Sequence, residues 1–504
     1  MTISRRSFLK TSLWSAMGLW GSRFRPILDQ LDNSSPNVII LVFDSLSARH
    51  LSLHGYERDT APHLSQFAEH ATVYHRHYST GNFTSPGTAS LLTGLYPWTH
   101  RAFDQAGLIS KHHVDSNLFH WLDPSYQRAA YAQNLWADLF LYQFEKHLDV
   151  HIKSTAYSLV DLVDYNTDLW QKDPLGAFRA HEDFLGQDYG IPAALYGSFF
   201  DKLKSYLASK EILAKWKKEY PRGVPNLGKY KVYFLPEQVF NGISGDIVRL
   251  REPFAGYFHF FPPHEPYFAN RRFIGRFDDG WLPTPKPLHP LSDHVPQDQL
   301  NQARQQYDEY IANVDESFGQ IYLHLQQAGI LDHTYLMITA DHGQLFERGV
   351  HGHVTPLLYD PVIHTPLIIS APGQSERHDI YSPTSCVDIL PTLLKITGTR
   401  RPDWLEGNVL PGFGGEADSQ RPVFAMDAKT NSAFEPLTQA TFAMIQGDYK
   451  LIWYIGYPGY HDVYELYNLK TDPEELLDLS QSHVEILSPM ANELKLKLTR
   501  ADQL

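Results

Sequence analysis

This chain of 504 residues has a single cysteine, no long apolar run and no excess of basic residues. Its single cysteine cannot form an internal disulfide, so the fold must rest on a packed core or on a metal. No run of about eighteen apolar residues occurs, which excludes an ordinary transmembrane helix. Lys and Arg number 43 against 57 Asp and Glu, and the formal net charge of −14 argues against a general nucleic-acid binder. A small anionic substrate is still compatible with this charge, because a local metal or histidine cluster can override the global field.

The residues that are present have a globular composition, with 43% hydrophobic and 20% charged residues. The lone thiol, Cys386, stands in SPTSCVDILPTLL at the expected start of an apolar helix. A buried structural cysteine is therefore expected there, and not a nucleophile.

Paired arginines stand close to the beginning of the sequence, in Ser4-Arg5-Arg6-Ser7-Phe8-Leu9-Lys10, before a mildly apolar stretch. This order is typical of a twin-arginine export signal, which we expect over residues 1–30. The alternative is a disordered basic tail. A signal of this type implies contact with the twin-arginine translocation machinery and a periplasmic or extracellular location. No clean cleavage site follows, so an uncleaved signal could hold the protein at the membrane.

Strand and helix patterns alternate along the rest of the chain. The strand patterns are at residues 37–43, 128–132, 256–261, 334–340 and 362–370. One helix pattern begins near Asp59 to Pro62, and three more cover residues 117–122, 303–327 and 483–498. This alternation predicts an α/β fold with a mostly parallel central sheet flanked by helices and a smaller C-terminal subdomain. We expect a catalytic domain over residues 36–400, with an insertion at about 144–245, and the subdomain over 401–504.

Acidic residues follow two of the apolar strand patterns directly. Asp44 comes after VIILVF, and Asp341 with His342 comes after TYLMITA. In open α/β sheets, ligands bind beyond the carboxyl ends of the strands. Taken singly, Asp44 could be a helix N-cap and the Asp-His pair a turn. Together with the Thr84 hydroxyl, these side chains form a mixed oxygen and nitrogen set suited to a divalent cation.

Thr84 lies in GNFTSPGTASLLTG, where a hydroxyl and Pro86 precede a short apolar run. The pattern predicts a helix start, whose free N–H groups and positive dipole end make a good anion pocket. A cation that lowered the pKa of the hydroxyl would let Thr84 attack phosphorus or sulfur.

Over roughly residues 37–479 the chain resembles the sulfatase branch of the alkaline phosphatase superfamily. The matching segments are DSLSARHLSLHGYERDTAPHLSQFA, FFPPHEPY, TADHGQLFERGVHGH, PLIISAPG, VDILPTLLKITG, YKLIWY and ELYNLKTDPEELLDLS. The resemblance implies that Asp44, Asp341 and His342 bind one divalent metal ion (Mn, Zn, Mg or Ca) together with Thr84. It also implies that His264 contacts the anionic oxygens of the substrate or protonates the leaving group, with His353 a further candidate for this work.

The chain departs from the family pattern in three places. Thr84 stands where the sulfatases carry the Cys or Ser that becomes formylglycine, and Thr88 replaces the supporting arginine. Asp44-Ser45 replaces a paired Asp-Asp, which removes one oxygen ligand. The Gly-Lys-Trp-His segment has no match, and Asn134 is the substrate-binding candidate in the corresponding place. Thr cannot form the aldehyde, whereas related phosphodiesterases and phosphoglycerol- or phosphoethanolamine-type transferases use a Thr nucleophile.

These departures favour a metal-dependent hydrolase or transferase that cleaves a phosphate mono- or diester through Thr84. A sulfuric ester hydrolase is the first alternative, and a non-catalytic binder of an anionic glycan or lipid headgroup is the second. The expected partner is a small anionic ester, either of a glycan or of a lipid headgroup.

Overall fold

The fold was obtained as a computed structural model, which describes residues 35–104, 107–160, 176, 207–228, 232–433 and 435–501. The predicted export signal and much of the predicted insertion lie outside the described residues. Within the described part, no helix is both long and apolar enough to cross a membrane.

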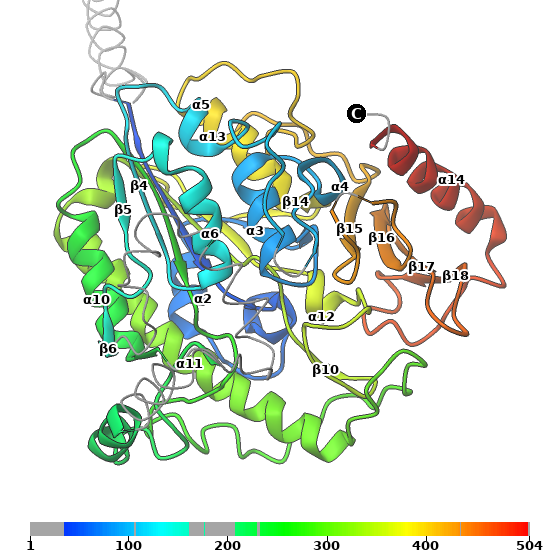
Figure 1. Ribbon diagram of the computed structural model, residues 1–504, viewed down its shortest axis with the longest axis horizontal. Helices are drawn as coiled ribbons and strands as arrows, with labels where there is room; N and C mark the ends of the chain where they lie inside the picture. Colours follow the sequence, from blue (N-terminus) through cyan, green and yellow to red (C-terminus); the bar gives the residue numbers. More distant parts are fainter. Residues whose placement is uncertain are drawn as a thin grey trace, which may run out of the picture.

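A central sheet of eight strands runs through the larger part of the molecule, in the order β13-β2-β12-β9-β1-β8-β4-β5 (Figure 1). Five consecutive strands that reach one edge of the sheet are parallel, namely β9 (Thr334–Thr339), β1 (Asn37–Phe43), β8 (Phe254–Phe260), β4 (Gln127–Ala132) and the edge strand β5 (Val150–Ile152). At the other edge β12 (Leu367–Ser370) pairs antiparallel with β9 and with β2 (Thr72–Tyr74), and β13 (His378–Ile380) pairs parallel with β2. The predicted α/β fold with a mostly parallel sheet is confirmed.

Helices cover both faces of this sheet, which explains why β1 is apolar at every position after Asn37. Ile39, Leu41 and Phe43 pack toward α2 (Pro62–Ala68), α10 (Pro236–Ile247) and α11 (Gln297–Gln327). Val38, Ile40 and Val42 belong to the other core, with α3 (Thr84–Thr93), α5 (Leu118–Trp121), α6 (Leu135–Gln143) and α13 (Ile389–Ile396). Figure 1 shows the two helix layers on opposite sides of the strands.

The C-terminal part forms a separate antiparallel sheet of four strands in sequence order. These are β15 (Val423–Asp427), β16 (Ala440–Gln446), β17 (Tyr449–Ile455) and β18 (Val463–Asn468). Helix α14 (Val484–Ala501) packs against it through Met490, Ala491 and Leu494 (Figure 1). The core of this sheet is shared with the larger part of the molecule, because Tyr96, Trp98 and Phe103 belong to the same apolar cluster.

Short elements complete the described chain. They are the strands β3 (His77–Tyr78), β6 (Ser158–Val160), β7 (Tyr233–Phe234), β10 (Leu345–Glu347), β11 (Val350–Gly352) and β14 (Thr384–Ser385), the helices α4 (Pro97–His100) and α12 (Asp360–Ile363), and 3₁₀ turns at Ala48–His50, Ser52–His54, Glu145–His147, Ile330–His333 and Cys386–Asp388. Cys386 is buried with a free thiol, as predicted.

One predicted strand is wrong in its first half. Residues 362–370 were expected to be extended, but Val362 and Ile363 end the short helix α12 and the strand begins only at Leu367. Pro361 stands in the first turn of that helix, where its missing N–H costs no helical hydrogen bond. Pro366 then separates the helix from the strand.

Candidate active site

Three strands of the central sheet end at one edge and bring polar side chains together there. Asp44 follows β1, Asp341 and His342 follow β9, and His259 lies near the end of β8. One ligand atom each of Asp44, His259 and Asp341 lies within 4.8 Å of the others, and all three residues are buried. His342 Nε2 lies 3.4 Å from Asp44 Oδ1 and 3.6 Å from Asp341 Oδ2.

Each carboxylate of this cluster uses one oxygen for support and presents the other to the centre. Asp341 Oδ1 accepts the backbone N–H groups of Ser45, at 3.1 Å, and of His342, at 3.0 Å. Asp44 Oδ2 accepts the side-chain amide of Asn134. The remaining oxygens, Asp44 Oδ1 and Asp341 Oδ2, are buried without a hydrogen-bond partner.

The two histidines likewise use one ring nitrogen for a supporting contact and present the other to the centre. His342 Nδ1 lies 2.9 Å from the carbonyl oxygen of Gly343, and a carbonyl can only accept, so Nδ1 carries the proton. His259 Nδ1 lies 2.9 Å from the hydroxyl of Tyr257. Both Nε2 atoms are buried without a hydrogen-bond partner. A hydrogen bond at Nδ1 fixes the orientation of a metal-binding histidine. Two nitrogens with two carboxylate oxygens suit a divalent cation.

The charged groups of the cluster act on one another. Burial would raise the pKa of Asp44, but the positive charge of His264 and the nearby rings of His259 and His342 hold it well below its usual value. Burial and the Asp44 charge raise the pKa of Asp341. Burial opposes a charged His342, yet the neighbouring Asp341 and Asp44 raise its pKa. A cation at the centre would relieve the repulsion between the two carboxylates.

Thr84 is the first residue of α3, where the helix N-terminus points its free N–H groups outward. Its Oγ1 accepts a hydrogen bond of 3.1 Å from Asn134 Nδ2, the same nitrogen that donates to Asp44. The approach of α3 depends on Gly87, because a Cβ at that position would lie 2.1 Å from the backbone oxygen of Asp341. The sequence therefore places the Thr84 hydroxyl directly beside the acidic cluster.

A pocket of about 690 Å³ opens in front of Thr84 and Asn134. His264 and His353 stand on its wall with their ring centroids 4.8 Å apart. The Nδ1 atom of His264 lies 2.8 Å from the Glu265 carbonyl, and that of His353 lies 2.8 Å from Gln344 Oε1. Both Nδ1 atoms donate to these oxygens, which leaves each Nε2 for a ligand.

All seven residues that the sequence singled out, namely Asp44, Thr84, Asn134, His264, Asp341, His342 and His353, lie in or beside this pocket and cluster. His259 and Lys429 were missed. His259 is the lone polar residue in the apolar run FAGYFHF, a setting in which a histidine is more often structural. Lys429 comes from the C-terminal part, which carries no motif for the site.

Comparison with known families agrees with this geometry. The family described as Sulfatase matches residues 36–399, and the C-terminal domain of N-sulphoglucosamine sulphohydrolase matches residues 349–503. The chain belongs to the sulfatase family. It is therefore an ester hydrolase of that family, in the alkaline phosphatase superfamily, and the buried cluster is consistent with the metal site of a sulfatase.

Individual sulfatase-family relatives and structural neighbours differ in their named activities. The choline-sulfatase of Rhizobium meliloti (strain 1021) is 23% identical over 485 residues, covering 90% of this chain and 84% of that protein. The phosphonate monoester hydrolase of Agrobacterium radiobacter superposes with a TM-score of 0.65 at 18% identity, covering 93% of this chain and 96% of the other. A 2-O GAG sulfatase superposes with a TM-score of 0.63 at 16% identity and covers 93% of both chains. At these identities the structural likeness concerns the fold.

Proposed function

We propose that this sulfatase-family hydrolase cleaves a phosphate mono- or diester, or transfers its phosphoryl group, with Thr84 as the nucleophile. The observation that carries the proposal is the hydrogen bond from Asn134 Nδ2 to Thr84 Oγ1, at the positive end of α3. Because Asn134 donates, it favours the alkoxide form of Thr84 over the hydroxyl. A threonine side chain cannot become the aldehyde that a formylglycine sulfatase needs.

The cation site fits the donors that are present. Asp44, His259, Asp341 and His342 would hold one divalent ion, which when bound would lower the pKa of a neighbouring hydroxyl and offset negative charge on a phosphoryl group. The sequence predicts that Thr84 also binds this ion, and this stays a prediction.

Thr84 attacks phosphorus as the alkoxide, the bond from phosphorus to the ester oxygen breaks, and a Thr84 phosphoester forms. His264 lies at the pocket wall with Nε2 unused by Glu265, and in its protonated form it gives the Nε2 proton to the leaving oxygen. Water then attacks phosphorus and Thr84 leaves as the alkoxide. The proton that the water loses returns to His264 through solvent, which restores the enzyme; an alcohol in place of water would give transfer.

His353 is suited to a different task from His264. Burial and the positive charges of His342 and His264 hold the pKa of His353 well below its usual value, so this ring is neutral. Its Nδ1–H is held by Gln344, so Nε2 has a free lone pair. We assign His353 to accept the proton of the attacking water in the second step.

The test is a panel of aryl phosphate, phosphodiester, phosphonate and sulfate esters, assayed with Mn²⁺, Zn²⁺ or Ca²⁺ on wild type and Thr84→Ala. We expect a phosphorus ester to be the fastest substrate and Thr84→Ala to lose at least about a thousandfold in kcat. A quenched reaction should leave one phosphoryl group on the peptide that contains Thr84, detected by mass spectrometry. Thr93→Ala is the control, since this hydroxyl on the same helix donates to the Ala89 carbonyl.

A sulfuric ester hydrolase is the competing function, and the family membership favours it. Sulfate turnover faster than every phosphorus ester would establish that function in place of the one proposed. Equal activity of Thr84→Ala and wild type would remove Thr84 from the chemistry under either function. A panel with no turnover at all would favour a binder of an anionic glycan or lipid headgroup.

A further inference from the structure

Lys429 is a cationic side chain in the active-site pocket that comes from outside the central α/β domain. It follows β15, the edge strand of the C-terminal sheet, and lines the same pocket as Thr84, His264 and His353. Neither the metal cluster nor the chemistry assigned above uses it.

Direct contacts hold this part of the C-terminal sheet against the nucleophile segment. The backbone N–H of Met426 donates to the carbonyl of Thr80 at 2.9 Å, four residues before Thr84. Lys429 Nζ then lies 5.2 Å from the ring centroid of Phe83, the residue that precedes the nucleophile. A cation over an aromatic face is attracted to the ring and is held in place by it. The Lys429 ammonium group is therefore positioned at the pocket and not left on a free surface.

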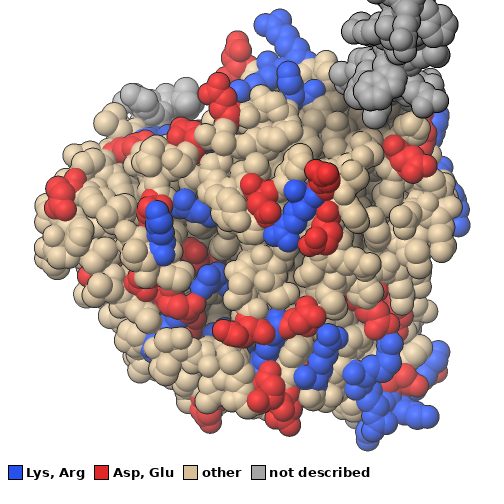
Figure 2. Space-filling view, turned by 180° about the vertical axis from the view of Figure 1, so that it is seen from behind, with Lys and Arg blue, Asp and Glu red and all other residues tan. Residues whose placement is uncertain are grey.

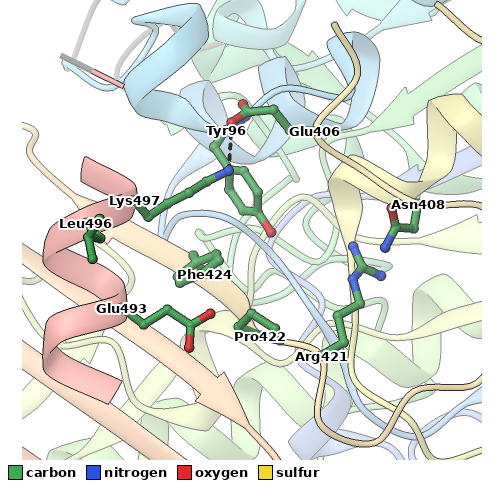
Figure 3. A pocket seen from close by; sticks show the side chains of 9 residues that line it. All are labelled: Tyr96, Glu406, Asn408, Arg421, Pro422, Phe424, Glu493, Leu496 and Lys497. Carbon is green, nitrogen blue, oxygen red and sulfur yellow. Dashed lines mark hydrogen bonds and ion pairs between the residues drawn. The ribbon is translucent and has the colours of Figure 1, made fainter. Parts of the chain in front are cut away.

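No ion pair with Lys429 is found among the residues that the structure describes. A second pocket, of about 570 Å³ between α14 and the rest of the molecule, shows the contrast (Figure 3). Its two cations are both paired: Lys497 Nζ lies 3.1 Å from Glu406, and Arg421 makes contacts of 2.6 and 2.7 Å with Asp388. Taking a charge out of water is costly unless a counter-charge meets it. The buried carboxylate of Asp427 attracts Lys429 without forming an ion pair with it, so a bound anion could still complete the partners of this ammonium group.

Aromatic side chains line the same pocket as this ammonium group. Phe83, Phe261, Phe268 and Trp136 all line the pocket. Such side chains pack on the flat apolar face of an aryl group or a sugar ring. The pocket therefore offers one cation beside an extended apolar wall, in addition to the groups around Thr84.

We infer that Lys429 binds a second anionic group of the substrate, carried by the alcohol that leaves, while the ester itself reacts at Thr84. The substrate class is then an ester of an acidic alcohol, with a carboxylate, sulfo or phosphoryl group next to a flat apolar face. This inference rests on the proposed function, because it places the ester at Thr84. The reacting group already has Asn134, His264 and His353 around it, which leaves Lys429 for the far end of the molecule.

The test compares matched aryl esters that carry either a carboxylate or a neutral carboxamide at the far end of the ring. The ester type is whichever one the wild type hydrolyses in the panel. We expect wild type to prefer the carboxylate in kcat/KM by about tenfold or more, since hydrogen bonds to charged groups are the stronger ones. Lys429→Met should abolish this preference, and Lys429→Arg should retain it.

The neutral ester separates binding of a second group from a role in the chemistry. Lys429→Met should leave its kcat/KM within about twofold of wild type. An equal loss on both esters would overturn the inference and place Lys429 on the reacting group or in the fold. Lys470→Met is the control, because this lysine of the C-terminal part has a 74% exposed side chain and pairs with Asp448 at its surface.

A binding measurement keeps the inference testable without turnover. The corresponding phenol products, with carboxylate or carboxamide, are titrated into wild type and Lys429→Met by calorimetry. Tighter binding of the carboxylate to wild type alone supports the inference even if Thr84 proves not to be the nucleophile. Equal affinities of both products for wild type would refute it.

Discussion

Removing the Tyr257 hydroxyl, as in Tyr257→Phe, should weaken metal binding without touching a metal ligand. The hydroxyl lies 2.9 Å from His259 Nδ1, and both side chains are buried in the core. When Nε2 of His259 binds a cation, Nδ1 must carry the ring proton and needs an acceptor. In Tyr257→Phe that N–H has lost its acceptor.

The penalty falls mainly on the metal-bound form. In the metal-free variant the ring can move its proton to Nε2, where Asp44 Oδ2 lies 3.3 Å away. A buried donor without a partner costs about 1–3 kcal/mol. At about 1.4 kcal/mol for each factor of ten, the dissociation constant for the metal should rise by roughly 5- to 150-fold.

Metal affinity is measured by competition with a chromophoric chelator, and activity is measured against free metal concentration. We expect the activity curve to shift to higher metal with nearly the same maximum. Tyr74→Phe is the matched control, because its buried hydroxyl donates to the Pro411 carbonyl at 2.6 Å, away from the site. An unchanged dissociation constant in Tyr257→Phe, with the control unchanged as well, would refute His259 as a ligand held by Tyr257.

Three further predictions follow from the same geometry. Gly87→Ala should lower the melting temperature and cost most of the activity, because the new Cβ meets the Asp341 backbone oxygen; activity of folded protein at wild-type level would contradict the close approach. Two imidazoles and two carboxylates should bind Zn²⁺ or Mn²⁺ more tightly than Ca²⁺, which prefers oxygen ligands alone; thermal shifts with each ion would reveal the opposite order. Burial lowers the pKa of Lys429 to about 8 while Asp427 opposes the shift, and His353, His264 and Glu265 are further titratable groups that line its pocket. The ammonium form is present below that pKa, so the preference for an acidic alcohol should fade as pH rises through 8, and Lys429→Arg should keep it.

Acidic and basic side chains are interspersed over the face seen in Figure 2. That face therefore presents no field of a single sign, whereas Lys429 stands inside a pocket. Local pockets focus a field more strongly than a mixed surface does.

The central sheet and most of the site were predictable because they depend on local patterns. Parallel strands buried on both faces are continuous apolar runs, and their carboxyl ends lie at one edge of the sheet. Asp44 and Asp341 each follow such a run, so the sequence placed both at that edge, and the pairing of β1 with β9 brings them together. Thr84 was predictable from its place at a helix start.

His259 and Lys429 were not predictable for two different reasons. His259 lies inside a strand, and its role depends on the partner strands, since it stands in register with Val42 of β1 and Ala132 of β4. Lys429 reaches the pocket because β15 is hydrogen-bonded to Thr80 through the backbone N–H of Met426. These two segments lie far apart in the chain. Neither the register of His259 nor the contact of β15 with Thr80 produces a recognisable spacing of residues in the sequence.

Two features of the metal cluster, Ser45 and His259, are related to each other. Ser45 stands where the family pattern has a second aspartate, and its backbone N–H supports Asp341 in place of a carboxylate ligand. His259, on the adjacent strand, supplies a donor to the same centre. Four buried atoms without partners would each cost free energy in an empty site, so packing alone would not select them. Their convergence at the one edge where the strands end is accounted for by a bound cation, with a nitrogen donor in place of the lost oxygen.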